Sequence, residues 1–101
     1  MQYMNLHLYS DIKPFEVVRR ISDKTLEIRE MSAILDSDFK PEIEVGGFFG
    51  RCTNQNDQRY TYKSNESAAI IRCRLTKKGW KSVYGMHKPC DQPKKFYDYN
   101  F

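Results

Sequence analysis

The fold is decided by Phe15-Glu16-Val17-Val18-Arg19-Arg20-Ile21 and Thr25-Leu26-Glu27-Ile28-Arg29, two stretches joined by Ser22-Asp23-Lys24. Apolar and charged residues alternate in both stretches, which places Leu26 and Ile28 on one face of a strand. The pattern predicts an antiparallel hairpin. Oppositely charged side chains then lie across from each other, where they help to fix the register.

A second hairpin is predicted in the second half of the chain. Residues 69–75 alternate between an apolar face, which holds Ile71 and Cys73, and a face that carries two arginines. Lys77-Lys78-Gly79 then turns the chain into Trp80-Lys81-Ser82-Val83-Tyr84. This hairpin has an apolar inner face and a basic outer face.

The remaining segments are shorter. Arg59-Tyr60-Thr61-Tyr62-Lys63 is predicted as a strand with both tyrosines on one face. Residues 96–101 hold four aromatic side chains, and burying them favours a final strand that completes the sheet. An exposed aromatic tail that docks on a partner is the alternative. Connections are expected at residues 31–38 (one helical turn or an extended edge), 46–50 (a bend that turns two rings into the core) and 85–93 (a loop with two prolines).

These elements indicate the fold class. About five to seven short strands joined by hairpins, without a long amphipathic helix, favour a mainly β protein, a small antiparallel barrel or rolled sheet of SH3-like size. A chain of 101 residues buries only about two-thirds of its unfolded surface. We therefore expect a single domain over residues 1–101.

The net charge of +4 is unevenly distributed along the chain. Residues 1–50 carry a balance of −3 and residues 51–101 a balance of +7, which indicates a polyanionic partner for the basic half. No apolar run approaches the roughly 20 residues that a membrane span needs. The first seven residues lack the charged start and apolar centre of a signal peptide, so we expect a soluble protein in the cytoplasm.

The cysteines are Cys52, Cys73 and Cys90. An odd number without a close pair is a poor disulfide framework. A zinc site would recruit all three together with His87, which is separated from Cys90 by two residues. Structural zinc sites usually contain two close pairs, so the pattern favours small buried thiols and no metal.

The sequence contains no catalytic motif. His7 and His87 are the only imidazoles, and none of the motifs of serine or metal hydrolases accompanies them. A nuclease site built from Asp57, Glu66 and Lys63 would combine carboxylates for a metal with a cation for the phosphate. That spacing is generic, and we therefore predict no enzymatic activity and no cofactor.

Four parts of the chain resemble a group of short, uncharacterised proteins of bacteriophages and mobile elements. These parts are Arg20-Ile21-Ser22-Asp23-Lys24-Thr25-Leu26-Glu27-Ile28-Arg29, Gly46-Gly47-Phe48 with Cys52-Thr53-Asn54-Gln55, Lys63-Ser64-Asn65-Glu66, and Lys95-Phe96-Tyr97-Asp98-Tyr99-Asn100-Phe101. The similarity spans most of the chain, although the related proteins usually have histidine where this chain has Arg51. The resemblance implies a phage-borne protein that acts inside a bacterium, and it implies no mechanism.

Basic residues of the second half form the candidate binding surface. They are Arg59, Lys63, Arg72, Arg74, Lys77, Lys78 and Lys81, and the aromatic residues Tyr60, Tyr62, Trp80 and Tyr84 are interleaved with them. Single-strand binders use this mixture to hold phosphates and to stack bases. A solvated basic face above a core of aromatic rings is the competing interpretation.

A second hypothesis follows from the resemblance. Small phage proteins without catalytic groups commonly act by occupying a partner's surface, and the positive net charge disfavours simple mimicry of DNA. The resemblance favours an inhibitor of a host defence complex, such as an anti-CRISPR or another anti-defence protein. Its partner would be a host bacterial protein or ribonucleoprotein complex. We rank this hypothesis slightly ahead of a single-stranded nucleic-acid-binding module.

Overall fold

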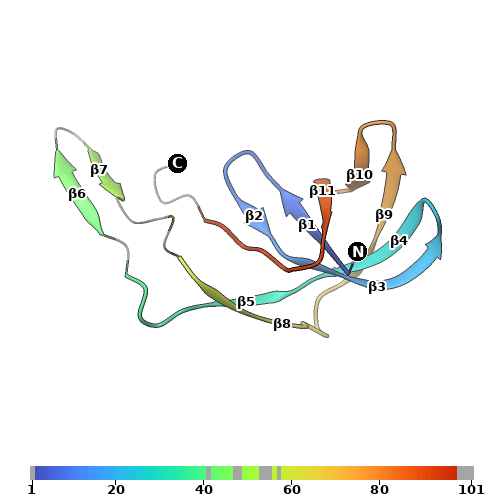
Figure 1. Cartoon of the computed structure of the whole chain (residues 1–101), viewed down its shortest axis with the longest axis horizontal. Helices are drawn as coiled ribbons and strands as arrows, with labels where there is room; N and C mark the ends of the chain where they lie inside the picture. Colours follow the sequence, from blue (N-terminus) through green and yellow to red (C-terminus); the bar gives the residue numbers. More distant parts are fainter. Residues whose placement is uncertain (1, 41, 47–48, 53–55, 57, 98–101) are drawn as a thin grey trace.

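The computed structural model describes residues 2–40, 42–46, 49–52, 56 and 58–97, and for residues 43–46 and 49–52 it describes the backbone alone (Figure 1). This part of the chain is mainly β, as predicted. Its strands are β1 (Tyr3–His7), β2 (Ile12–Lys13), β3 (Phe15–Ser22), β4 (Thr25–Glu30), β5 (Ser32–Leu35), β6 (Ile43–Gly46), β7 (Phe49–Cys52), β8 (Tyr60–Lys63), β9 (Ile70–Thr76), β10 (Gly79–Ser82) and β11 (Gly85–Cys90). No helix in the described ranges is long and apolar enough to cross a membrane.

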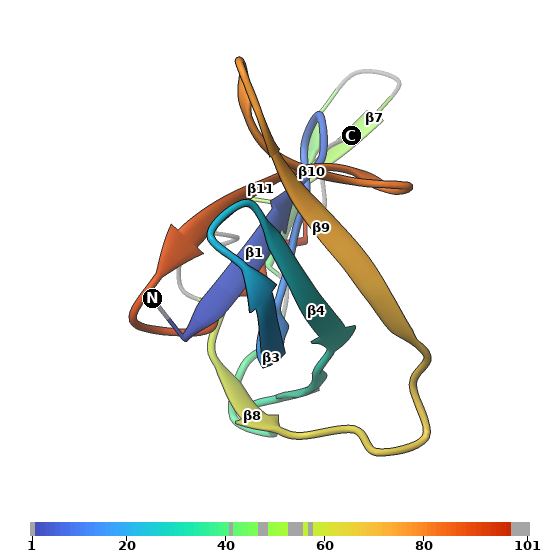
Figure 2. The same cartoon turned by 90° about the vertical axis from the view of Figure 1, so that its right-hand side faces the viewer.

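Six strands close into an antiparallel barrel, which lies on the right of Figure 1 and is turned toward the viewer in Figure 2. Their order is β11-β10-β9-β4-β3-β1, and β1 pairs in turn with β11. β2 adds a seventh strand beside β1. The prediction of a small antiparallel barrel is confirmed.

The hairpin predicted from the opening stretches is formed by β3 and β4. The Arg29 guanidinium donates to Glu16 Oε1 over 2.8 Å, and Arg19 Nε lies 3.8 Å from Glu27 Oε1. These are the cross-strand charge pairs that the alternation predicted. They lie on the outer face, while the apolar residues of β4 point into the barrel.

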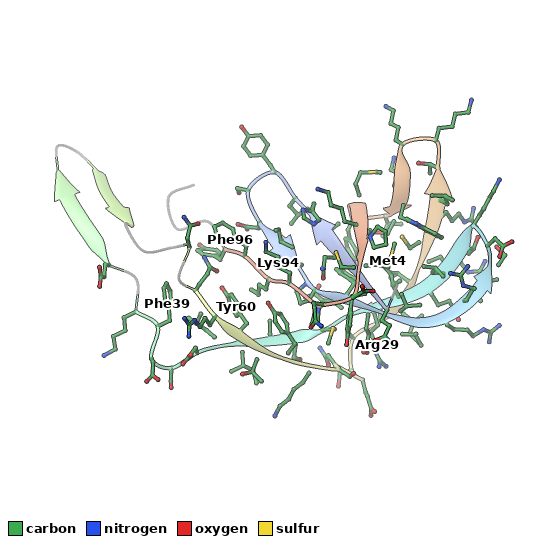
Figure 3. All side chains as sticks on the ribbon, in the orientation of Figure 1. Met4, Arg29, Phe39, Tyr60, Lys94 and Phe96 are labelled. Carbon is green, nitrogen blue, oxygen red and sulfur yellow. The ribbon has the colours of Figure 1, made fainter. Side chains whose placement is uncertain are left out.

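The core fills the interior of the barrel because β1, β3, β4, β9 and β10 contribute buried apolar residues to it. Met4, labelled among the barrel strands in Figure 3, is fully buried there. Among the described residues, the cluster consists of Met4, Leu6, Phe15, Leu26, Ile28, Cys73 and Trp80, with Val17 and Ile71 packed against it. A single hydrophobic core therefore holds the six barrel strands together.

The prediction of a loop at residues 85–93 was wrong for its first six residues, which form β11. β11 lies between β10 and β1 and closes the barrel. Pro89 lies in the part of β11 that pairs with β1 alone, so its missing N–H removes no hydrogen bond to β10. Two neighbouring strands thus override a local preference for turns.

β11 is the strand that closes the barrel. The aromatic content had predicted a closing strand at residues 96–101. Phe96 forms an isolated bridge to Ile12, with reciprocal backbone hydrogen bonds of 3.0 Å. Residues 98–101 lie outside the described residues. β1 was not predicted, although Met4 and Leu6 alternate with Asn5, and Asn5 is itself buried in the structure.

The remaining strands form an arm, which we define as β5 to β8. β5 pairs with β8, and β6 pairs with β7, in two separate two-stranded sheets. Figure 1 shows the arm extending away from the barrel, and the molecule reaches 52 Å along its longest axis. Of the two alternatives for residues 31–38, the extended one is therefore correct over β5. Residues 47 and 48 of the expected bend lie outside the described residues.

Candidate functional site

The basic hairpin, defined as β9, β10 and the turn Lys77-Lys78 between them, lies between β4 and β11 in the barrel. Residues on β9 alternate, so that Cys73 is buried while Arg72 and Arg74 are exposed. Lys81 on β10 lies directly opposite Arg74. Cross-strand partners of this kind project from the same face of a sheet, which places these cations together.

The tip of the basic hairpin is held by hydrogen bonds. Thr76 Oγ1 donates to the Gly79 carbonyl over 2.7 Å and accepts from the Lys78 N–H over 3.2 Å. Gly79 has a φ of +121°, a conformation that residues with a side chain rarely adopt. The turn therefore presents Lys77 and Lys78, both exposed, at a defined position.

Two open grooves follow the outer face of the hairpin. One of about 420 Å³ is lined by Arg72, Arg74, Thr76, Lys81, Ser82 and Val83, and another of about 430 Å³ is lined by Thr76, Lys77, Lys78, Lys81 and Met86. Thr76 and Lys81 line both grooves. We call the five cations Arg72, Arg74, Lys77, Lys78 and Lys81 the cationic surface.

Among the described residues, the cationic surface has no negatively charged partner. None of its five side chains has a carboxylate within 4 Å among the described residues. Glu27 lies opposite Arg72 on β4, but its carboxylate is near Arg19 on β3. Like charges directly opposite each other, as Arg74 and Lys81 are, destabilise a sheet. A bound anion would relieve this repulsion.

The structure separates Arg59 and Lys63 from the other predicted site residues. Lys63 ends β8 and Arg59 precedes it, and β8 pairs with β5 in the arm rather than with β9. The prediction that all seven basic residues lie on neighbouring hairpin strands and their turn is therefore correct for five residues and wrong for Arg59 and Lys63. Residues 64–69 intervene between β8 and β9, and this connection lets β8 join a different sheet.

The aromatic residues are mostly unsuited to stacking on a ligand. Trp80 belongs to the core and is only 8% exposed. The half-buried Tyr60 and Tyr62 are hydrogen-bonded, Tyr60 as donor to Gln58 Oε1 and Tyr62 as acceptor from the Lys95 N–H. Tyr84 differs from these three, because it is 58% exposed on the turn after β10.

A series of hydrogen bonds that involves the buried His87 and Ser82 supports that turn. His87 Nδ1 lies 2.8 Å from the Met4 carbonyl, and His87 Nε2 lies 2.7 Å from Ser82 Oγ. Since a carbonyl only accepts, Nδ1 carries the proton and Nε2 of the neutral ring accepts from the Ser82 hydroxyl. Ser82 Oγ also accepts from the Tyr84 N–H over 3.2 Å. The sequence shows no signal for this pair beyond the presence of the residues.

The environment of the histidines predicts a pH-dependent stability. Burial lowers the pKa of His87 below its ordinary value of 6.5. The hydrogen bond to the Met4 carbonyl raises this pKa, but its effect is smaller. Burial, with Lys88 and Lys94 nearby, lowers the pKa of His7 as well. The unfolded chain then binds protons more readily than the folded protein as the pH falls below about 6.5. We therefore expect the melting temperature to fall between pH 7.5 and pH 5.

The contribution of His87 can be separated from that of His7 with the variants His7→Gln and His87→Gln. The His7→Gln protein should retain most of the fall in melting temperature, and the His87→Gln protein should lose most of it. The slope due to one histidine cannot exceed about 1.4 kcal/mol per pH unit. A wild-type melting temperature that stays constant from pH 7.5 to 5 would contradict this prediction.

Two of the four residues considered for zinc, Cys73 and His87, have other environments. Burial raises the pKa of the Cys73 thiol to about 11, which disfavours the thiolate that zinc requires. Both ring nitrogens of His87 have partners within the barrel. The side chain of Cys52, and Asp57 of the considered nuclease site, lie outside the described residues. In the described part of the chain, no three His, Cys, Asp or Glu side chains are grouped to hold a metal.

The fold and this surface together define a small closed antiparallel β-barrel with a projecting cationic hairpin. The chain matches no protein-family model, no curated protein and no solved structure.

Proposed function

We propose that the chain is a nucleic-acid-binding β-barrel that holds a phosphate backbone on its cationic surface. The observation that carries this proposal is the cross-strand pair Arg74 and Lys81, two like charges face to face without a carboxylate partner among the described residues. Thr76 and Lys81 line both of the grooves on this hairpin. A phosphate chain supplies the repeated negative charge that such a surface can neutralise. The role is one of binding rather than catalysis.

Salt dependence tests this function. The affinity for a fluorescently labelled oligonucleotide, measured by anisotropy from 50 to 300 mM salt, should fall steeply. If all five cations contact phosphates, the plot of log affinity against log salt concentration should have a slope of about −3 to −4 for a single strand. Retention on heparin should show the same dependence. Absence of binding at about 0.1 M salt, or a slope near zero, would reject the proposal.

An inhibitor of a host defence complex, acting in the bacterial cytoplasm, is the second candidate. It is supported by the resemblance to phage proteins and by one structural observation. Val83 and Tyr84, 86% and 58% exposed, adjoin the groove that Arg72 and Arg74 line. Aromatic side chains and arginines are enriched in protein interfaces, so this combination also suits a protein partner.

Nuclease treatment of a lysate distinguishes the two functions, because they predict different binding after nucleic acid has been digested. An inhibitor should co-elute at fixed stoichiometry with one host complex after nucleic acid has been digested, and it should reduce the activity of that purified complex. A phosphate-binding protein should lose its association with the lysate when nucleic acid is digested. Its affinity should also depend on salt in the same way for all sequences.

A further inference from the structure

The turn between β10 and β11 presents the side chains of Val83 and Tyr84 to solvent, while a hydrogen bond holds its backbone. Ser82 Oγ accepts from the Tyr84 N–H, and the same hydroxyl is bonded to the buried His87. Gly85, with a φ of +140°, follows at once, and a Cβ there would lie 3.6 Å from Leu6. The Tyr84 ring also lies 6.3 Å, centroid to centroid, from the buried ring of Phe15. Tyr84 is thus exposed and positioned at the same time.

This turn adjoins the cationic surface. Val83 and Ser82 line the same groove as Arg72 and Arg74, and Tyr84 is the next residue along the chain. The cations occupy β9, β10 and their turn, with Glu27 beside them on β4 and Met86 on β11. Neighbouring strands lie about 4.8 Å apart, so this band is narrow and suits one phosphate backbone.

We propose that Tyr84 is the base-stacking residue of this site, and that the ligand is a single strand whose phosphates lie along Arg72, Arg74 and Lys81. This inference rests on the proposed function and adds the class of nucleic acid. Inside a duplex the faces of the bases are already stacked, whereas an unpaired base can place its face on an exposed ring. Ser82 and His87 are positioning residues, because they hold the turn that presents the ring.

The test compares two oligonucleotides with the same phosphates, one with bases and one abasic, against the wild-type protein and the variants Tyr84→Ala and Tyr84→Phe. Removing one stacked base should weaken binding by about tenfold. The wild type and Tyr84→Phe should therefore prefer the normal strand by about tenfold. Tyr84→Ala should bind both strands alike, with an unchanged salt slope, since no ionic contact is removed. Melting temperatures confirm that each variant is folded.

A second readout does not depend on affinity. A strand that contains 5-bromouracil should cross-link on irradiation to Tyr84, as identified by mass spectrometry of the peptides. Equal binding of normal and abasic strands by the wild type would overturn the stacking role while leaving phosphate binding intact. A Tyr84→Ala protein that loses a host protein partner, but treats the two strands as the wild type does, would assign the turn to a protein interface instead. Absence of any salt-dependent binding would overturn the proposed function together with this inference.

Discussion

The double variant Arg74→Glu/Lys81→Glu is expected to bind a single-stranded oligonucleotide at least about a hundredfold more weakly than the wild type. Each hydrogen bond to a charged group contributes about 1.5–3 kcal/mol, and every 1.4 kcal/mol corresponds to about tenfold in affinity. The salt slope should fall by about two, because two phosphates are no longer neutralised by the protein. Anisotropy titrations at several salt concentrations measure both quantities.

The matched control is Arg59→Glu/Lys63→Glu, which changes the net charge by the same amount at the two ends of β8, just before its first residue and at its last. Its effect should be limited to a few-fold, because charges farther away than about 8 Å are largely screened at physiological salt. Folding should survive in both proteins. Reversing both members of the Arg74 and Lys81 pair keeps like charges opposite each other, and exposed strand positions usually change stability by about 0.5 kcal/mol or less. An equal fall in affinity in the two variants would show that the net charge, rather than the cationic surface, governs binding.

Phe15→Ala should destabilise the protein more than any surface change. Phe15 is 2% exposed in the barrel core, and its ring meets that of His87 edge-on with centroids 5.0 Å apart. Replacing a buried phenylalanine by alanine costs about 3–5 kcal/mol, which is a large part of the 5–15 kcal/mol that stabilises typical domains. Chemical denaturation followed by circular dichroism should show a much lower midpoint or a protein that is already unfolded.

Tyr9→Ala provides the corresponding control, because it also removes an aromatic ring. Tyr9 is 96% exposed, and substitutions at such positions usually change the free energy of unfolding by about 0.5 kcal/mol or less. The midpoint of this variant should therefore match that of the wild type. A Phe15→Ala protein as stable as Tyr9→Ala would contradict the placement of the core inside the barrel.

The two central hairpins could be predicted from the sequence because their information is local. Alternation with a period of two places Leu26 and Ile28 on one face of β4, and it places Cys73 between the outward Arg72 and Arg74 of β9. The partner strands follow after short turns, so pairing of sequence neighbours suffices. For the same reason, the five cations of the basic hairpin were correctly grouped.

The closure of the barrel and the composition of the site were decided by contacts between distant parts of the chain. β1 pairs with β11, about eighty residues away, and this pairing turns six residues of a predicted loop, Pro89 among them, into a strand. β8 pairs with β5, which removes Arg59 and Lys63 from the basic hairpin. The hydrogen bonds that join His87 to Met4 and to Ser82 form only when the barrel closes. A local pattern specifies which face of a strand is apolar, whereas the choice of partner depends on burial of the whole core.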